Sequence, residues 1–121
     1  MSDNRQKIGV MGEQLAANYL RKTGKKILCT NYRCRYGEID IIARDQETIL
    51  FIEVKSRTSN TFGPPAAAVT MHKQQQIIKT ALYYLTEKNL SDTAVRLDVI
   101  AVLFQREQEP CIEYISNAFE I

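Results

Sequence analysis

The stretch NYRCRYGEIDIIARDQETILFIEVKSR, residues 31–57, decides the fold of this chain. It contains most of three segments that are rich in β-branched and aromatic side chains and are predicted as strands, namely 26–34, 37–44 and 48–56. The dipeptide Tyr36-Gly37 and the tripeptide DQE at 45–47 separate them as short turns. Because connections this short favour antiparallel neighbours, the stretch predicts a three-stranded meander.

Two helices are predicted on either side of this meander. Apolar residues recur at helical spacing over residues 8–22, and Gly24 just beyond is the expected C-cap. A second, longer helix is predicted from residue 66 or 70 to residue 88. The polar segment 57–65, which ends in Gly-Pro-Pro, is the expected loop before it.

Two further strands complete the pattern. The almost continuously apolar segment 94–104 (AVRLDVIAVLF) is typical of an interior strand covered on both faces, and 111–115 predicts a short edge strand. The order α-β-β-β-α-β-(β) describes an α/β fold with one mixed sheet flanked by helices. Its length of 121 residues fits a single domain, residues 1–121.

Composition excludes several classes of protein. Hydrophobic residues make up 45% and charged residues 25%, as in an ordinary globular protein. No apolar run approaches the roughly 18 residues of a membrane span, and the first residues lack the apolar region of a signal peptide. We therefore expect no membrane association and a cytoplasmic location. Three cysteines and one histidine argue against a disulfide framework or a structural zinc site.

Charge is unevenly distributed along the chain. Residues 1–35 carry eight Lys or Arg against two acidic residues, a balance of +6, and residues 36–121 carry −4. A basic end beside an acidic cluster suits a protein that attracts phosphates and holds cations, although the same charges also fit an ordinary solvated surface. With no tryptophan and few aromatic side chains expected at the surface, backbone and shape readout of nucleic acid is favoured over base stacking.

Strand alternation groups the polar residues of the meander. In the segment 37–44 it predicts one face with Glu38, Asp40 and Ile42, and another with Ile39, Ile41 and Ala43. In the next strand, Glu53 and Lys55 share a face with Phe51. Charges at the ends of otherwise apolar strands must face water, pair with one another or bind a cation.

These residues suit a divalent metal ion. Mg²⁺ takes oxygen ligands, commonly one or two carboxylates plus waters, which Asp40 and Glu53 supply, with the Val54 backbone carbonyl as a third ligand. Lys55 could orient or help deprotonate a water near a scissile phosphate. The metal would lower the pKa of that water and offset charge that develops on the phosphate oxygens.

Four more residues are predicted to support this site. Glu13 lies on the edge of the apolar stripe of the first helix, where a carboxylate could reach the sheet. Lys73 and Gln74 stand one turn before the buried stripe of the second helix, beside the positive end of its dipole. Arg57 follows Lys55 closely. We predict that Lys73 and Arg57 contact nucleic acid and that Gln74 supports catalysis.

Taken singly, each of these residues has a simpler explanation. An E-x-K sequence on a strand is usually surface charge, and Glu13 alone fits a helix acid stabilised by the dipole. Asp98, two residues after Arg96 on an apolar strand, suggests a structural ion pair rather than a ligand. The joint order along one short chain is what indicates a site: helix Glu, strand Asp, strand Glu-x-Lys, helix Lys-Gln.

That order resembles the PD-(D/E)xK nuclease superfamily, which includes restriction endonucleases and Holliday-junction resolvases. Over nearly its whole length the chain is similar to the YraN-like family of small bacterial proteins assigned to that superfamily. The segments that carry the likeness are GEQLAANYL at 12–20, NYRCRYGEIDIIARD at 31–45, FIEVKSR at 51–57, GPPAAAVTMHKQQQI at 63–77, RLDVIAV at 96–102 and NAF at 117–119.

The resemblance implies a restriction-endonuclease-like fold and a site that uses Mg²⁺ or Mn²⁺. Glu13, Asp40, Glu53 and Lys55 match the acid, metal-binding and water-positioning places of the superfamily, and Gln74 matches a supporting position on a helix. One departure is Ile39, which stands where the superfamily name has proline.

The implied function is a metal-dependent endonuclease that hydrolyses phosphodiester bonds in DNA, including branched or damaged DNA in repair or recombination. Resolvases of this class work as dimers, so a homodimer is compatible with the resemblance, and the oligomeric state stays open. An alternative is a catalytically silent nucleic-acid-binding or assembly module with a vestigial site. A third alternative is an interaction scaffold that binds neither metal nor nucleic acid.

Overall fold

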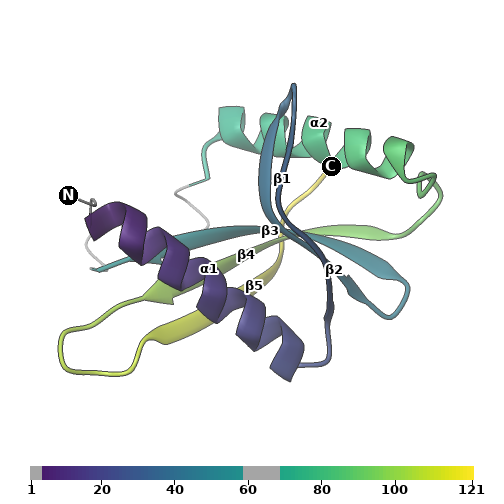
Figure 1. The fold of residues 1–121 in the computed structure, drawn as a ribbon. Coiled ribbons are helices and arrows are strands. Elements are labelled where there is room, and N and C mark those ends of the chain that lie inside the picture. Colours follow the sequence, from purple (N-terminus) through teal and green to yellow (C-terminus); the bar gives the residue numbers. More distant parts are fainter. Residues whose placement is uncertain (1–3, 59–68) are drawn as a thin grey trace.

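The computed structural model describes residues 4–58 and 69–121, and these form a five-stranded sheet with a helix on each face (Figure 1). The elements are α1 (Asn4–Lys22), β1 (Lys26–Cys34), β2 (Gly37–Asp45), β3 (Thr48–Arg57), α2 (Met71–Glu87), β4 (Val95–Leu103) and β5 (Cys111–Phe119). The strands lie in the order β1-β2-β3-β4-β5. β3 and β4 run parallel, and the other neighbouring pairs are antiparallel. The predicted α/β fold and element order are confirmed.

Two apolar clusters hold the helices to the sheet, one on each face. On the α1 side, Ala16 and Leu20 pack against alternate residues of β3, including Leu50 and Ile52. On the α2 side, Ile77 and its buried neighbours pack with the intervening residues of β3, including Phe51. Each face of β3 is therefore covered, as expected of a central strand. The alternation predicted for β3 is confirmed.

Local signals set the ends of both helices. Gly24 has φ +85°, and the backbone N–H of Lys25 donates to the Leu20 carbonyl, which closes α1 as predicted. The Thr70 side chain accepts a hydrogen bond from the backbone N–H of Lys73, so Thr70 is the N-cap of α2. α1 begins at Asn4, four residues before the predicted start. The prediction missed these residues because they are mostly polar and show no apolar periodicity.

The last strand is longer than predicted. β5 runs to Phe119 rather than ending at residue 115. Its pairing with β4 shifts register between Leu97 and Val99, and Asn117 in this region has φ +53°. The backbone N–H of Asn117 donates to Asp98 Oδ1 at 2.8 Å. The polar pair Ser-Asn at 116–117 hides this continuation in the sequence, because it breaks the apolar pattern without ending the strand.

β2 departs from the predicted alternation near its start. Ile39 packs in the α2-side cluster together with Ile42, whereas Ile41 and Ala43 pack on the α1 side. The prediction that Ile39, Ile41 and Ala43 share a face was therefore wrong for Ile39. The reason is that β2 pairs with β3 only from Ile41 onward, and its earlier part curves with β1 toward α2 (Figure 1).

Part of the predicted loop 57–65 and the predicted helix start at residue 66 lie outside the described residues. Arg57 closes β3 rather than opening that loop. Within the described ranges, neither helix combines the length and the apolar character needed to cross a bilayer.

Candidate active site

The candidate site lies where β2 separates from β3. The described β2–β3 ladder runs from Asp45↔Thr48 to Ile41↔Ile52, and beyond it β3 continues beside β4. We call the point just past this last pair the fork. Here Asp40 Oδ2 accepts a hydrogen bond of 2.8 Å from the backbone N–H of Val54. A side-chain carboxylate thus bridges the two strands where backbone pairing has ended.

Glu53 is the buried acid of the fork. It is 7% exposed and follows Ile52, the last residue of β3 to pair with β2. Burial raises the pKa of its carboxyl to about 8, and the charge of Asp40 and a hydrogen bond between the two side chains add to this rise. Two acids thus lie together where Glu53 is almost fully buried and Asp40 is half-buried. Such a pair is costly when both are ionised, unless a positive charge joins them.

Glu13 reaches the same place from the opposite face of the sheet. Burial raises the pKa of its carboxyl, and its contact with Asp40 raises it further, with a smaller effect from Glu38. The preceding residue allows this approach, since a Cβ at Gly12 would overlap the Ser56 side chain of β3. α1 therefore lies directly against β3 at this point. Glu13 can reach Asp40 because the fork is open to both faces.

Two lysines bring positive charge to the fork. Both Lys73 and Lys55 act to lower the pKa of Glu53, Lys73 the more strongly. Lys55 is half-buried on β3, and Lys73 lies in the first turn of α2, where the Thr70 cap orders the helix start. Their charges offset part of the repulsion between the acids, yet the pKa of Glu53 stays well above its ordinary value.

The other predicted residues have different surroundings. Gln74 Nε2 donates a hydrogen bond of 2.9 Å to the Val69 carbonyl, which ties the start of α2 to the residue before its cap. Arg57 lines a hollow with residues of β4 and β5, including Leu103 and Glu113, rather than the carboxylate cluster. The Val54 N–H is committed to Asp40, and a ligand role for its carbonyl stays a prediction. The contact roles of Gln74 and Arg57 stay predictions as well.

The donor set at the fork was compared with what a divalent ion requires. Within residues 4–58 and 69–121, no group of three or more His, Cys, Asp or Glu side chains is arranged to hold an ion. Asp40 and Glu53 remain as two neighbouring carboxylates, and Mg²⁺ often takes only one or two from a protein, keeping waters and substrate oxygens for the rest. The residues present therefore fit Mg²⁺ or Mn²⁺ better than a closed protein cage for another metal.

Gly12 is a positioning residue that the sequence reasoning missed. Glycine inside a helix costs about 1 kcal/mol relative to alanine, so its place directly before Glu13 was a usable signal. In the structure that cost has a visible reason, because an added Cβ would require the Ser56 side chain to move.

Comparison with known proteins identifies the family. Residues 12–102 match the model of the uncharacterised protein family UPF0102. The chain belongs to the UPF0102 family. A UPF0102 protein of Geobacter metallireducens is 51% identical over 121 residues, which cover 100% of this chain and 98% of that protein. A UPF0102 protein of Syntrophus aciditrophicus is 53% identical over 114 residues, covering 93% and 88%.

UPF0102 membership confirms the family part of the resemblance, that to the YraN-like proteins. The names of these relatives state no reaction and no ligand. The residues at the fork are therefore what indicates a function.

Proposed function

We propose that this chain is a divalent-metal-dependent endonuclease of the PD-(D/E)xK superfamily, which hydrolyses phosphodiester bonds in DNA. The observation that carries the proposal is the meeting of acids and lysines from four elements at the fork. Burial and Asp40 raise the pKa of Glu53 to about 8, so at neutral pH the pair holds a proton that a divalent cation can displace. A structural ion pair would instead have its countercharge already in place.

Each residue then has a chemical role. Asp40 and Glu53 would hold Mg²⁺ or Mn²⁺, which when bound lowers the pKa of a water and balances charge on the phosphate. Lys55 on β3 would orient the attacking water through its ammonium group. Lys73, at the positive end of the α2 dipole, contacts a phosphate oxygen. Glu13 orders Asp40 and the water around it from the α1 side.

A polar groove beside the fork supports a nucleic-acid substrate. It lies between α1 and β1, and its α1 side extends from Val10 past Glu13 to Arg21 in the basic last turn of the helix. A phosphate backbone that enters the fork along this groove would meet hydrogen-bond donors and a cation. The basic N-terminal third of the sequence is in keeping with this path.

The experiment is a cleavage assay with labelled branched, single-stranded and duplex DNA in Mg²⁺ or Mn²⁺. Asp40→Asn and Glu53→Gln should each reduce the cleavage rate at least about 100-fold, because the ion loses a charged ligand. Asp45→Asn, at the other end of β2, is the matched control and should cut like the wild type. Cleavage that persists in both fork variants would show that the fork is not the catalytic site.

Titration calorimetry with Mn²⁺ separates this proposal from its alternative. We expect binding by the wild type and its loss in Glu53→Gln. A wild-type protein that binds DNA in a salt-sensitive way, ignores Mn²⁺ and cuts nothing would instead be a catalytically silent nucleic-acid-binding or assembly module.

A further inference from the structure

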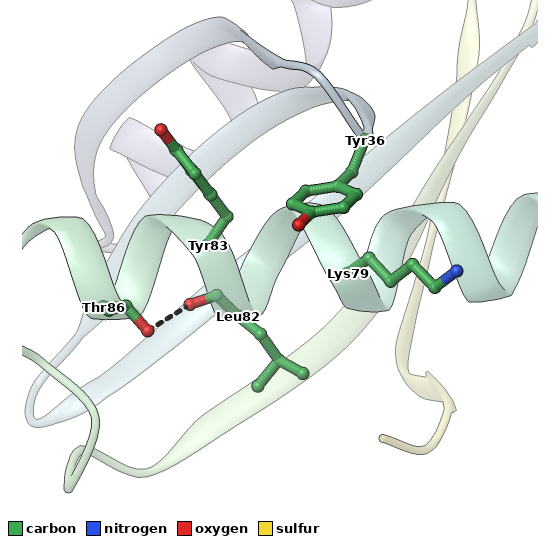
Figure 2. Close-up of a pocket in the computed structure, with 5 residues that line it drawn as sticks. All are labelled: Tyr36, Lys79, Leu82, Tyr83 and Thr86. Carbon is green, nitrogen blue, oxygen red and sulfur yellow. Dashed lines mark hydrogen bonds between the residues drawn. The ribbon is translucent and has the colours of Figure 1, made fainter.

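Two exposed tyrosines lie side by side on the α2 face of the molecule. Tyr36, in the turn between β1 and β2, is 37% exposed, and Tyr83 on α2 is 40% exposed. Their ring centroids are 6.0 Å apart with an angle of 62° between the planes. Figure 2 shows both side chains on the same side of α2. The sequence alone does not indicate this pair, because the two rings are 47 residues apart and only the fold joins them.

The surroundings of these rings are cationic. The hollow between them is also lined by Lys79, Leu82 and Thr86, and among the residues that the structure describes no acidic side chain lines it. The Arg35 guanidinium lies 4.9 Å from the centroid of the Tyr36 ring, and its Nη2 donates to the Tyr36 hydroxyl at 2.8 Å. We call Arg35, Tyr36, Lys79 and Tyr83 the tyrosine patch. Aromatic faces with nearby cations are the combination that binds unpaired nucleotides.

The backbone beneath the patch is firmly placed. Gly37 has φ +151° and lies so close to α2 that an added Cβ would be 3.2 Å from Thr80 Oγ1. Glycine at this position lets the hairpin turn rest directly on the helix. The contact of the hairpin turn with α2 therefore fixes Tyr36 relative to Tyr83.

The patch lies close to the fork along both elements. Asp40 is three residues beyond Gly37 on β2, about 10 Å at the rise of a strand. Lys73 is ten residues before Tyr83 on α2, about 15 Å at the rise of a helix. A few nucleotides of one strand span such distances, so a base on the patch and a phosphate at the fork can belong to the same strand.

We propose that the tyrosine patch binds an unpaired base and its phosphate, and that the substrate therefore contains a single-stranded segment next to the bond that is cut. The proposal rests on the nuclease function proposed above and specifies its substrate class. A contact between two copies of the chain is the competing use of this surface. Stable interfaces bury about 800 Å² on each partner, whereas three exposed apolar side chains, Tyr36, Leu82 and Tyr83, contribute here and Lys79 lies among them.

The test is fluorescence anisotropy with labelled oligothymidine and with a blunt duplex of equal length, in EDTA so that no strand is cut. Tyr36→Leu and Tyr83→Leu remove a ring and keep apolar bulk, and each should weaken single-strand binding roughly 5- to 150-fold, the range that stacking of one base supports. Binding to the duplex should change less than about 2-fold. Tyr36→Phe and Tyr83→Phe are the matched controls and should bind like the wild type, with circular dichroism melts confirming that all variants fold.

Three outcomes would overturn the patch. They are unchanged single-strand binding in both Leu variants, equal loss in the Phe variants, and absence of wild-type binding to oligothymidine. A dimer seen by sedimentation that Tyr83→Leu dissociates, with single-strand binding intact, would assign the surface to self-association instead.

A protein that binds single strands through the tyrosines but cuts nothing would contradict the proposed function and leave the tyrosine patch supported. A protein that cuts while the Leu variants bind normally would sink the patch alone.

Discussion

Two buried acidic centres lie on neighbouring strands of this sheet and differ in how their charge is balanced. Asp98 on β4 is fully buried and pairs in register with Ile52, the residue before Glu53. Arg96 donates to both of its carboxylate oxygens, with Nε and Nη2 each at 2.9 Å, as anticipated for a structural ion pair. The Tyr114 hydroxyl and the Asn117 N–H complete its shell. At the fork, by contrast, the charged group that changes the pKa of Glu53 most is another acid, Asp40.

The difference shows how two buried carboxylates can serve opposite purposes. The protein supplies the whole countercharge and hydrogen-bond shell of Asp98, so that site is complete and stabilises the contact of β4 with β5. At the fork, the two lysines balance only part of the negative charge of the acids, so the site still lacks positive charge. A cation from solution can supply what is missing, which is why we place the chemistry at the fork and not at Asp98.

The largest expected effect on stability comes from a substitution at Asp98, the acid whose charge is fully balanced. Asp98→Asn should lower the free energy of unfolding by about 3 kcal/mol, because Arg96 loses its charged partner and the amide cannot accept all the donors around it. Urea unfolding measures this change. Asp92→Asn, at an exposed position before β4, is the matched control. A decrease in the free energy of unfolding of less than about 0.5 kcal/mol would show that the protein does not balance the charge of Asp98 as described.

The opposite change is expected at the fork. Because the folded-state pKa of Glu53 is about 8 against an ordinary 4.5, the folded protein holds this proton longer than the unfolded chain. The free energy of unfolding should therefore fall as pH rises from about 4.5 through 8. Glu53→Gln mimics the protonated acid and should be more stable than the wild type at pH 8 by about 1–2 kcal/mol in EDTA, with little difference at pH 4.

Urea unfolding at the two pH values measures the effect of Glu53→Gln. Glu113→Gln, at an exposed position on β5, is the control and should show no such dependence on pH. If Glu53→Gln differed from the wild type equally at both pH values, the charge of Glu53 would not be the cause.

The smallest effect concerns the partial compensation at the fork. Lys73→Met removes the stronger of the two positive charges that act on Glu53, so the pKa of the Glu53 carboxyl should rise further. Carbon-13 NMR of labelled glutamate carboxyls follows this titration directly. Lys88→Met, at the C-cap of the same helix, should leave it unchanged. An unchanged or lowered pKa in Lys73→Met would remove Lys73 from the site.

Much of this architecture was predictable from sequence because it follows local patterns. Successive residues of the strand around Glu53 face opposite sides of the sheet as expected, and Gly24 and Thr70 carry ordinary signals for helix ends. The sequence order also indicated that Glu13, Asp40, Glu53 and Lys55 belong together, and the structure places them at the fork. Their roles in metal binding and catalysis remain proposals.

What could not be predicted depends on contacts between distant segments. The separation of β2 from β3 reverses the expected face of Ile39, and no feature of that strand alone indicates it. The extension of β5 past Ser116 depends on the hydrogen bond from Asn117 to Asp98. The pairing of Tyr36 with Tyr83 depends on the hairpin turn resting on α2. In each case a partner far along the chain decides the conformation.

The glycine before Glu13 has a consequence for how such a protein can change over evolution. A methyl group at this position would meet the side chain of Ser56, so the helix and the strand would have to adjust to each other just before the acid that follows. A change of one codon there would perturb the approach of Glu13 to Asp40 while the pairing of the strands is kept. The place of the first helix at the fork is thus open to the smallest alteration a protein can undergo, with the sheet left intact.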